Sequence, residues 1–215
     1  MNYSERRRNY HTEQCKSARE HFKDFVADFK DYGDLQTLDW RNKDGSSNYH
    51  VHYIFDTKQR YLHISGDLGS AAFYLSWEPT FENVTSTKDI NYLAGKIECA
   101  TDKWVYPEEL VSEEIDEYME DIKPERDGFE DEDEYLCEKE DFESYVEELK
   151  KSVDYHRGLV VDDADLMKWM KHIFGMKHTF DFEFYEQNFG RVIAPRVYLW
   201  FMGLELAWEQ LQKAK

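Results

Sequence analysis

In the stretch Tyr49-His50-Val51-His52-Tyr53-Ile54-Phe55, a large apolar side chain occupies every second position. Successive side chains of a β-strand point to opposite faces, so this spacing predicts a strand with one buried face. A turn-like segment at residues 42–47 precedes it, and another strand is predicted before that turn at Leu35 to Arg41. Further strands are predicted at Tyr61 to Ser65 and at Ala71 to Trp77. These segments predict an antiparallel meander of about four strands with hairpin-length connections.

Apolar side chains at spacings of three and four predict a helix before the meander. It extends from about residue 12 to residue 32, where Gly33 can end it. Its apolar stripe consists of Cys15, Ala18, Phe22, Phe25, Val26 and Phe29. After the meander, Ser86 and Asp89 have the spacing of a capping box and predict a short helix that continues through Ile97.

The chain after Gly158 predicts one more strand between two helices. The first helix passes through residues 166–174, and the strand lies at residues 178–186, where phenylalanines alternate with polar residues. The last helix begins near Pro195. It is expected to bury Val197, Trp200, Phe201, Leu204 and Trp208. This order of elements predicts an α+β fold with an antiparallel meander sheet packed against helices.

Nearly all of the net charge lies between Glu108 and Glu148. This segment has 21 Asp and Glu against three basic residues, whereas the rest of the chain has 25 acids and 24 bases. The basic residues are Lys123, Arg126 and Lys139. The acidity is therefore local and does not reflect a general adjustment of solubility.

Two amphipathic helices are predicted within this acidic segment. Pro107 suits a first helical position, and apolar residues then recur at helical spacing until a break at residues 123–128. A second helix is predicted from Asp131 to Val153. The sequence therefore predicts an αα-hairpin inserted at residues 107–157, here called the acidic hairpin, in an α+β core formed by residues 1–106 and 158–215.

The carboxylates of the acidic hairpin are either a solvated surface or a binding surface. Duplex DNA carries one negative charge per about 1.7 Å, and two helices that rise about 1.5 Å per residue approach this density. Like charges that lie close together repel one another and so destabilise the fold. A surface with both acidic and basic residues would avoid this cost. We therefore expect the hairpin to mimic nucleic acid and to bind a nucleic-acid-binding protein with a basic groove, rather than nucleic acid itself. The expected partner-binding residues are Glu113, Glu114, Glu117, Glu120, Asp121, Phe129, Glu130, Asp131, Glu132, Asp133, Glu134, Glu138 and Asp141.

Three histidines are the strongest candidates for chemistry. His50 and His52 would project from one face of a strand, and His63 follows on the next strand, so three imidazoles could hold a metal with one open position. The alternative places these histidines on the wetter face of the sheet, and it is favoured because no neighbouring carboxylate in the sequence completes a recognisable motif. Signatures of a Ser or Cys nucleophile are missing as well. We therefore expect no catalytic residue, no metal and no cofactor.

The cysteines and the apolar segments indicate where the protein resides. Cys15, Cys99 and Cys137 are widely spaced and lack a Cys-x-x-Cys pair, so we expect free thiols in a reducing cytoplasm. The longest apolar stretch, around Val197 to Leu206, is too short to span a bilayer. The expected location is therefore the cytoplasm, without a membrane partner.

Three segments, Leu38–Arg41, Ser47–Asp56 and Tyr61–Ala71, resemble a pattern found in small proteins of phages and prophages. In size and acidity the chain is also similar to phage anti-defence inhibitors, including anti-CRISPR proteins and inhibitors of Gabija-type nuclease systems. This resemblance implies a non-enzymatic inhibitor that blocks a bacterial immune nuclease complex in the cytoplasm of the host. It implies no catalytic residue in this sequence.

Two other functions stay open at this point. One is a metal-dependent enzyme that uses His50, His52 and His63. The other is a virion structural or assembly protein, which would self-assemble or copurify with particles. Whether the chain forms a homo-oligomer is open in all three cases.

Overall fold

The computed structural model describes residues 3–100, 102–121, 123–154, 159–160 and 190–213. The chain divides into two compact units, unit 1 with residues 1–104 and 193–215, and unit 2 with residues 105–192. The start of unit 2 lies two residues from the start predicted for the acidic hairpin. The predicted end at residue 157 lies among residues that are not described, so this boundary stays a prediction.

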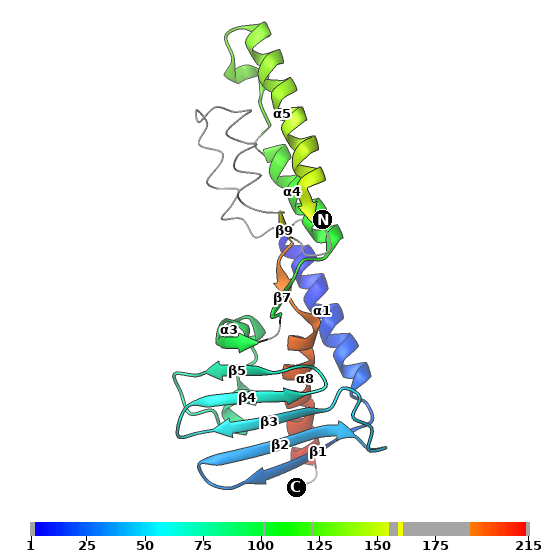
Figure 1. The fold of residues 1–215 in the computed structure, drawn as a ribbon, viewed down its shortest axis with the longest axis vertical. Coiled ribbons are helices and arrows are strands. Elements are labelled where there is room, and N and C mark those ends of the chain that lie inside the picture. The colour runs from blue at the N-terminus through cyan, green and yellow to red at the C-terminus, as the bar shows by residue number, and fades with distance from the viewer. Residues whose placement is uncertain (1–2, 101, 122, 155–158, 161–189, 214–215) are drawn as a thin grey trace. The chain divides into compact units, whose positions relative to one another are not determined.

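Unit 1 contains a six-stranded antiparallel sheet whose strands follow one another in chain order (Figure 1). The strands are β1 (Phe25–Asp31), β2 (Leu35–Asn42), β3 (Val51–Asp56), β4 (Tyr61–Gly66), β5 (Ala71–Tyr74) and β6 (Ile97–Ala100). Alternation in β3 buries Val51, Tyr53 and Phe55, as the sequence predicts. The α+β fold and the meander are confirmed, with two strands more than expected.

The prediction of a helix as far as residue 32 is wrong. Helix α1 (Tyr3–His21) ends before Phe22, and Phe25 begins strand β1. Phe25 and Phe29 fit a period of two as well as a helical stripe, and pairing with β2 decides in favour of the strand. Gly33 adopts a φ of 83° in the turn between β1 and β2 and does not end a helix.

The short helix predicted from the capping box differs in detail. The structure has two helices, α2 (Phe81–Ser86) and α3 (Ile90–Gly95), so Ser86 ends one helix and does not begin another. Asp89 alone is the N-cap of α3, where its side chain accepts from the backbone N–H groups of Asn91 and Tyr92. Ile97 belongs to strand β6.

Helix α8 (Pro195–Lys213) packs on the buried face of the sheet and contacts α1, α2, α3, β1 and β2 (Figure 1). Its predicted start at Pro195 is confirmed. Val197, Trp200 and Leu204 are buried, whereas Phe201 and Trp208 are half-buried. Phe201 meets Phe73 at a ring distance of 5.6 Å, and Trp208 meets Phe81 at 5.3 Å.

The backbone of α8 approaches the sheet closely at Gly203. The hydroxyl of Tyr53 donates to the carbonyl oxygen of Trp200 at 2.7 Å. A Cβ atom at Gly203 would lie 2.6 Å from the Tyr53 hydroxyl oxygen and 3.1 Å from Cδ1 of Trp40. Glycine therefore lets the helix approach these two buried side chains.

Helix α8 also covers part of the sheet edge at β1. The Gln210 side chain accepts from the Ala27 N–H at 2.8 Å and donates to the Phe25 carbonyl at 3.1 Å. These two backbone groups point away from β2, so the amide of Gln210 takes the place of a neighbouring strand. Such cover limits unwanted pairing at an edge strand.

Unit 2 holds the predicted αα-hairpin. Its helices are α4 (Glu108–Asp121), the 3₁₀ turn η1 (Arg126–Gly128) and α5 (Glu132–Ser152). Short strands are β7 (Trp104–Val105), β8 (Val153–Asp154), β9 (Leu159–Val160) and β10 (Val192–Ile193), with β7 paired to β10 and β8 to β9. The predicted helix at 166–174 and strand at 178–186 lie outside the described residues. Among the helices that the structure describes, none has the length and hydrophobicity to cross a bilayer.

Candidate functional site

Helix α4 has one buried face and one acidic face. Val111, Ile115 and Met119 are buried at helical spacing. Glu113 and Glu117, which occupy other faces of the helix, are exposed. Among the acids of α4 from Glu109 to Asp121, whose side chains are described, all are exposed with one exception.

Glu114 is that exception, and its assignment as a partner-binding residue is wrong. Its side chain is 5% exposed, and Oε2 accepts from the backbone N–H of Gly190 at 2.6 Å. A Cβ atom at Gly190 would come within 2.6 Å of the Val111 nitrogen, so Gly190 and α4 are in close contact. Glu114 thus joins two segments of unit 2 and is not available to a partner.

Replacing Glu114 by alanine is expected to lower the free energy of unfolding of unit 2 by about 1–3 kcal/mol, because the Gly190 N–H loses its acceptor. Hydrogen exchange of the α4 amides measures this change. The matched control is Glu109→Ala, which removes an exposed acid of the same helix and is expected to change stability by less than about 0.5 kcal/mol. Equal exchange rates in the two variants would contradict the role of Glu114.

The turn of the acidic hairpin is held by Arg126. Its Nε donates to Glu132 at 2.8 Å, and its Nη1 donates to the Phe129 carbonyl at 2.6 Å. The guanidinium also lies over the ring of Tyr135, 5.9 Å from the centroid. Asp131 accepts from the Asp133 N–H at 2.9 Å and so caps the start of α5.

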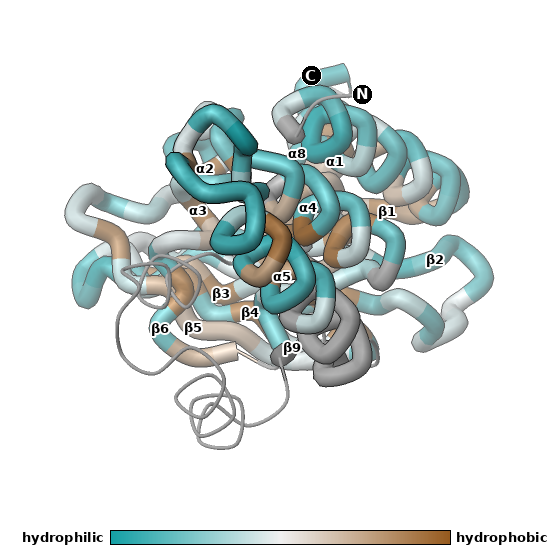
Figure 2. Tube along the Cα trace, turned by 90° about the horizontal axis from the view of Figure 1, so that it is seen from above, coloured by the Kyte–Doolittle hydropathy of each residue, from teal (hydrophilic) through white to brown (hydrophobic). Residues whose placement is uncertain are grey.

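The three bases between residues 108 and 148 are each paired with a nearby acid. Besides Arg126, Lys123 contacts Glu120 at 2.9 Å and Lys139 contacts Glu143 at 3.9 Å. These pairs are exposed, so each contributes little to stability. The three bases offset only a small part of the 21 acids between residues 108 and 148. In Figure 2 the hydrophilic colour predominates in the part of α5 that is coloured by hydropathy.

The charge of the hairpin is comparable with that of nucleic acid. Helix α5 has 21 residues, which corresponds to a length of about 30 Å. Duplex DNA of that length carries roughly 18 negative charges. The excess of acids over bases between residues 108 and 148 is also 18.

The structure places ten of the expected partner-binding residues on the surface. The exposed residues are Glu113, Glu117, Glu120, Asp121, Glu130, Asp131, Glu132, Asp133, Glu134 and Asp141. Glu138 and Phe129 are half-buried, and the Phe129 ring packs against Tyr135 at 5.7 Å.

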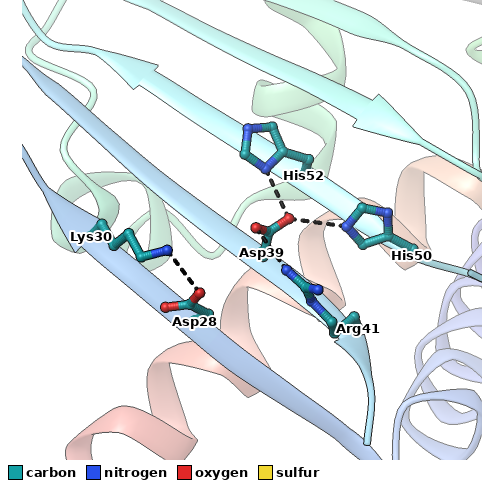
Figure 3. A network of polar contacts seen from close by, with 6 residues as sticks. All are labelled: Asp28, Lys30, Asp39, Arg41, His50 and His52. Atoms are coloured by element: carbon teal, nitrogen blue, oxygen red, sulfur yellow. Dashed lines mark hydrogen bonds and ion pairs between the residues drawn. The ribbon is translucent and has the colours of Figure 1, made fainter. Parts of the chain in front are cut away.

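A second polar cluster lies on the sheet face opposite the core, here called the open face. Asp39 of β2 is directly opposite His52 of β3 in the antiparallel register. His50 Nε2 and His52 Nδ1 both lie 3.0 Å from Asp39 Oδ1, and Arg41 Nη2 lies 3.0 Å from Oδ2 (Figure 3). An ionised carboxylate only accepts, so these two ring nitrogens carry hydrogen.

Backbone geometry near Tyr49 positions His50 in this cluster. Tyr49 has a φ of 58°, which is unusual for a residue other than glycine. Its N–H donates to Asp67 Oδ2 at 2.8 Å, and the Asp67 N–H donates to the His50 carbonyl at 2.9 Å. Asp67 lies in the turn after β4, and its two hydrogen bonds hold the backbone of Tyr49 and His50 to this turn.

The structure does not bring the three histidines together. His63 lies opposite Ile54 in the strand register and stacks on Tyr61, with a ring distance of 5.5 Å and an interplanar angle of 13°. No cluster of three or more His, Cys, Asp or Glu suited to a metal is found among the described residues. The side chains of His50 and His52 are instead bound to Asp39.

Asp39 and Arg41 are the cluster members that sequence reasoning missed. The alternation in Leu38-Asp39-Trp40-Arg41 indicates that both lie on one strand face. It does not indicate which residues of β3 lie opposite them. Only the register brings a carboxylate to the two histidines.

Burial raises the pKa of Asp39, but hydrogen bonds from His50 and His52 and the charges of His52 and Arg41 outweigh it and lower that pKa below 3.8. Because the pKa is lower in the folded state, Asp39 stabilises the fold above pH of about 4, and this contribution is lost as the pH falls through the folded pKa. Asp39→Asn is therefore expected to lower the free energy of unfolding by about 1–2 kcal/mol at pH 7. The difference from the wild type should shrink at pH 3.

Urea unfolding of the full chain at the two pH values measures this effect. The control is Asp28→Asn, because Asp28 lies directly opposite Asp39 on β1 but forms only an exposed pair with Lys30 at 3.0 Å (Figure 3). Its expected effect is below about 0.5 kcal/mol. If Asp39→Asn lowers the free energy of unfolding by the same amount at pH 7 and at pH 3, the role assigned to the charge of Asp39 is contradicted.

No family model matches this chain, and no curated protein or solved structure matches it either.

Proposed function

We propose that this chain is a non-enzymatic inhibitor whose acidic hairpin occupies the basic groove of a nucleic-acid-binding protein. The proposed target is a bacterial defence nuclease, of the CRISPR effector or Gabija type, and the proposed source is a phage or mobile element. The observation that supports this function is the exposure of ten candidate acidic side chains on one helical hairpin. Inhibition of this kind needs occupancy and no chemical step.

The physical basis is competition for the same cationic side chains. A groove that binds DNA is lined with Lys and Arg, and binding there gains free energy from the release of counterions. The carboxylates of α4, the turn and α5 together present a comparable number of charges to that groove. Binding of the hairpin would gain part of the same free energy of counterion release, because the hairpin also carries condensed counterions that the groove displaces.

Apolar side chains at the hairpin would add specificity to this attraction. Leu136 of α5 is 45% exposed, and Phe129 is half-buried at the turn. Aromatic and aliphatic anchors dominate the energetics of many protein interfaces, whereas exposed charges mainly set association rate and orientation. We therefore place the centre of the interface near the turn and the first part of α5.

The test is affinity capture from a bacterial lysate at low salt and at high salt, followed by mass spectrometry and competition with duplex DNA. We expect a stoichiometric nucleic-acid-binding protein at low salt, with less captured at high salt. Duplex DNA should release it. A partner that remains bound in excess DNA would contradict binding in the nucleic-acid groove, and capture of no such protein would contradict the proposed function.

A further inference from the structure

Two tyrosines of the open face form an exposed aromatic corner in unit 1. Tyr61 of β4 lies directly opposite Tyr74 of β5 in the antiparallel register. Their ring centroids are 5.4 Å apart with an interplanar angle of 55°. Tyr74 is 43% exposed, and His63 stacks on the other side of the pair, against Tyr61. The rings are therefore fixed by the sheet but accessible from outside.

A β-bulge lies beside the carboxylate that reaches Tyr61. Ala72 pairs with Cys99 and Phe73 pairs with Ile97, so Glu98 is an extra residue on β6. Bulges of this kind redirect a side chain. The hydroxyl of Tyr61, two strands away, donates to Glu98 Oε2 at 3.3 Å. The charge of Glu98 is the largest of the causes that raise the pKa of Tyr61.

Other aromatic rings of the protein are already covered by cations of the same chain. Lys96 lies 5.1 Å from the ring centroid of Tyr92, and Lys103 lies 5.8 Å from that of Trp104. Within the part of the chain that the structure describes, no Lys or Arg occupies such a position over Tyr61 or Tyr74. Tyr74, which is 43% exposed, can offer the negative face of its ring to a cation from outside.

We propose that Tyr61, Tyr74 and Glu98 form a recognition site for a cationic group, namely the guanidinium or ammonium group of an Arg or Lys side chain of a partner protein. The exposed ring of Tyr74 attracts the cation through its quadrupole, and Glu98, which is held by the hydroxyl of Tyr61, supplies an ionic contact. The same carboxylate repels phosphate, so the site does not suit nucleic acid. The site lies in unit 1 and does not rest on the function proposed for the acidic hairpin.

The test uses the full chain with isotope-labelled tyrosine rings, titrated with N-acetyl-arginine amide and observed by NMR. The matched ligand is N-acetyl-citrulline amide, which has nearly the same shape but no charge. We expect saturable shifts of the Tyr61 and Tyr74 ring signals with the arginine compound and none with the citrulline compound. Equal shifts with both ligands, or no shift with either, would overturn the proposal.

Variants separate the cation site from general effects on the fold. Glu98→Gln keeps the side-chain shape and is expected to weaken binding of the arginine compound by about threefold to tenfold. Tyr74→Ala should abolish the shift of Tyr61, whereas Tyr32→Ala, which removes another exposed tyrosine, should leave the titration unchanged. Charge reversal in the acidic hairpin should also leave it unchanged. Unaltered binding in Glu98→Gln would exclude the carboxylate from recognition and overturn the site as proposed.

Discussion

Reversing three exposed charges of the acidic hairpin, with Glu130→Lys, Glu134→Lys and Asp141→Lys together, is expected to weaken binding to the captured basic partner by at least about 30-fold. Each replacement removes an attraction and adds a repulsion within the same groove. The three acids are exposed, and their side chains form no hydrogen bond or ion pair with other described residues. Asp131 and Glu132 are left unchanged, because they cap α5 and bind Arg126. The hairpin should therefore stay folded.

Affinity measured by interferometry over a series of salt concentrations reports both strength and mechanism. The wild-type complex should weaken steeply with salt, and the variant should show a shallower dependence because fewer counterions are released. The matched control reverses three exposed acids of unit 1, with Glu13→Lys, Glu78→Lys and Glu82→Lys, and so has the same net charge. An equal loss of affinity in the control would show that net charge alone, and not the hairpin, determines binding.

Gly203→Ala is expected to lower the free energy of unfolding by about 2–3 kcal/mol, although alanine is the better helix former by roughly 1 kcal/mol. The new methyl group would lie 2.6 Å from the Tyr53 hydroxyl oxygen and 3.1 Å from Trp40 Cδ1. Tyr53 cannot move aside easily, because its side chain is fully buried and its hydroxyl is bound to the Trp200 carbonyl. Helix α8 would have to shift away from the sheet. Thermal and urea unfolding of the full chain measure the change.

Gly95→Ala is the matched control, since Gly95 is also helical and nothing lies within 4 Å of a Cβ atom there. This variant is expected to be as stable as the wild type or more stable, by up to about 1 kcal/mol. Tyr53→Phe removes the hydroxyl that the new methyl group meets, so its combination with Gly203→Ala should be less damaging than the sum of the two changes. Stabilisation by Gly203→Ala alone would contradict the close packing of α8 on β3.

Long segments with one clear periodicity could be predicted from the sequence. The alternation around Val51, Tyr53 and Phe55 predicts strand β3, and helical spacing after Pro195 predicts α8. The first helix was extended too far because Phe22, Phe25 and Phe29 satisfy a helical stripe, while Phe25 and Phe29 also satisfy strand alternation. Where two periods fit the same residues, local sequence does not decide between them, and pairing with another strand does.

In the candidate sites, too, some features follow from neighbouring residues and others depend on contacts between distant segments. The acidity of the hairpin and its helical spacing are properties of neighbouring residues, so the sequence predicts a charged two-helix element. Burial of Glu114 depends on Gly190, which is 76 residues away. Helical spacing from Val111 and Ile115 places Glu114 beside the apolar stripe of α4 and Glu113 away from it, but only packing within unit 2 identifies Glu114 as an internal residue.

The α+β class, the meander and the local acidity of residues 108–148 follow from the burial and charge of residues close together in the chain, so the amino-acid sequence is enough to predict them. Tertiary structure alone decided that Asp39 joins His50 and His52 while His63 stacks on Tyr61. It also decided that Glu98 reaches Tyr61 across the sheet. These contacts depend on strand register and on one bulge, which are set by backbone hydrogen bonds between segments and are not encoded in the periodicity of either segment.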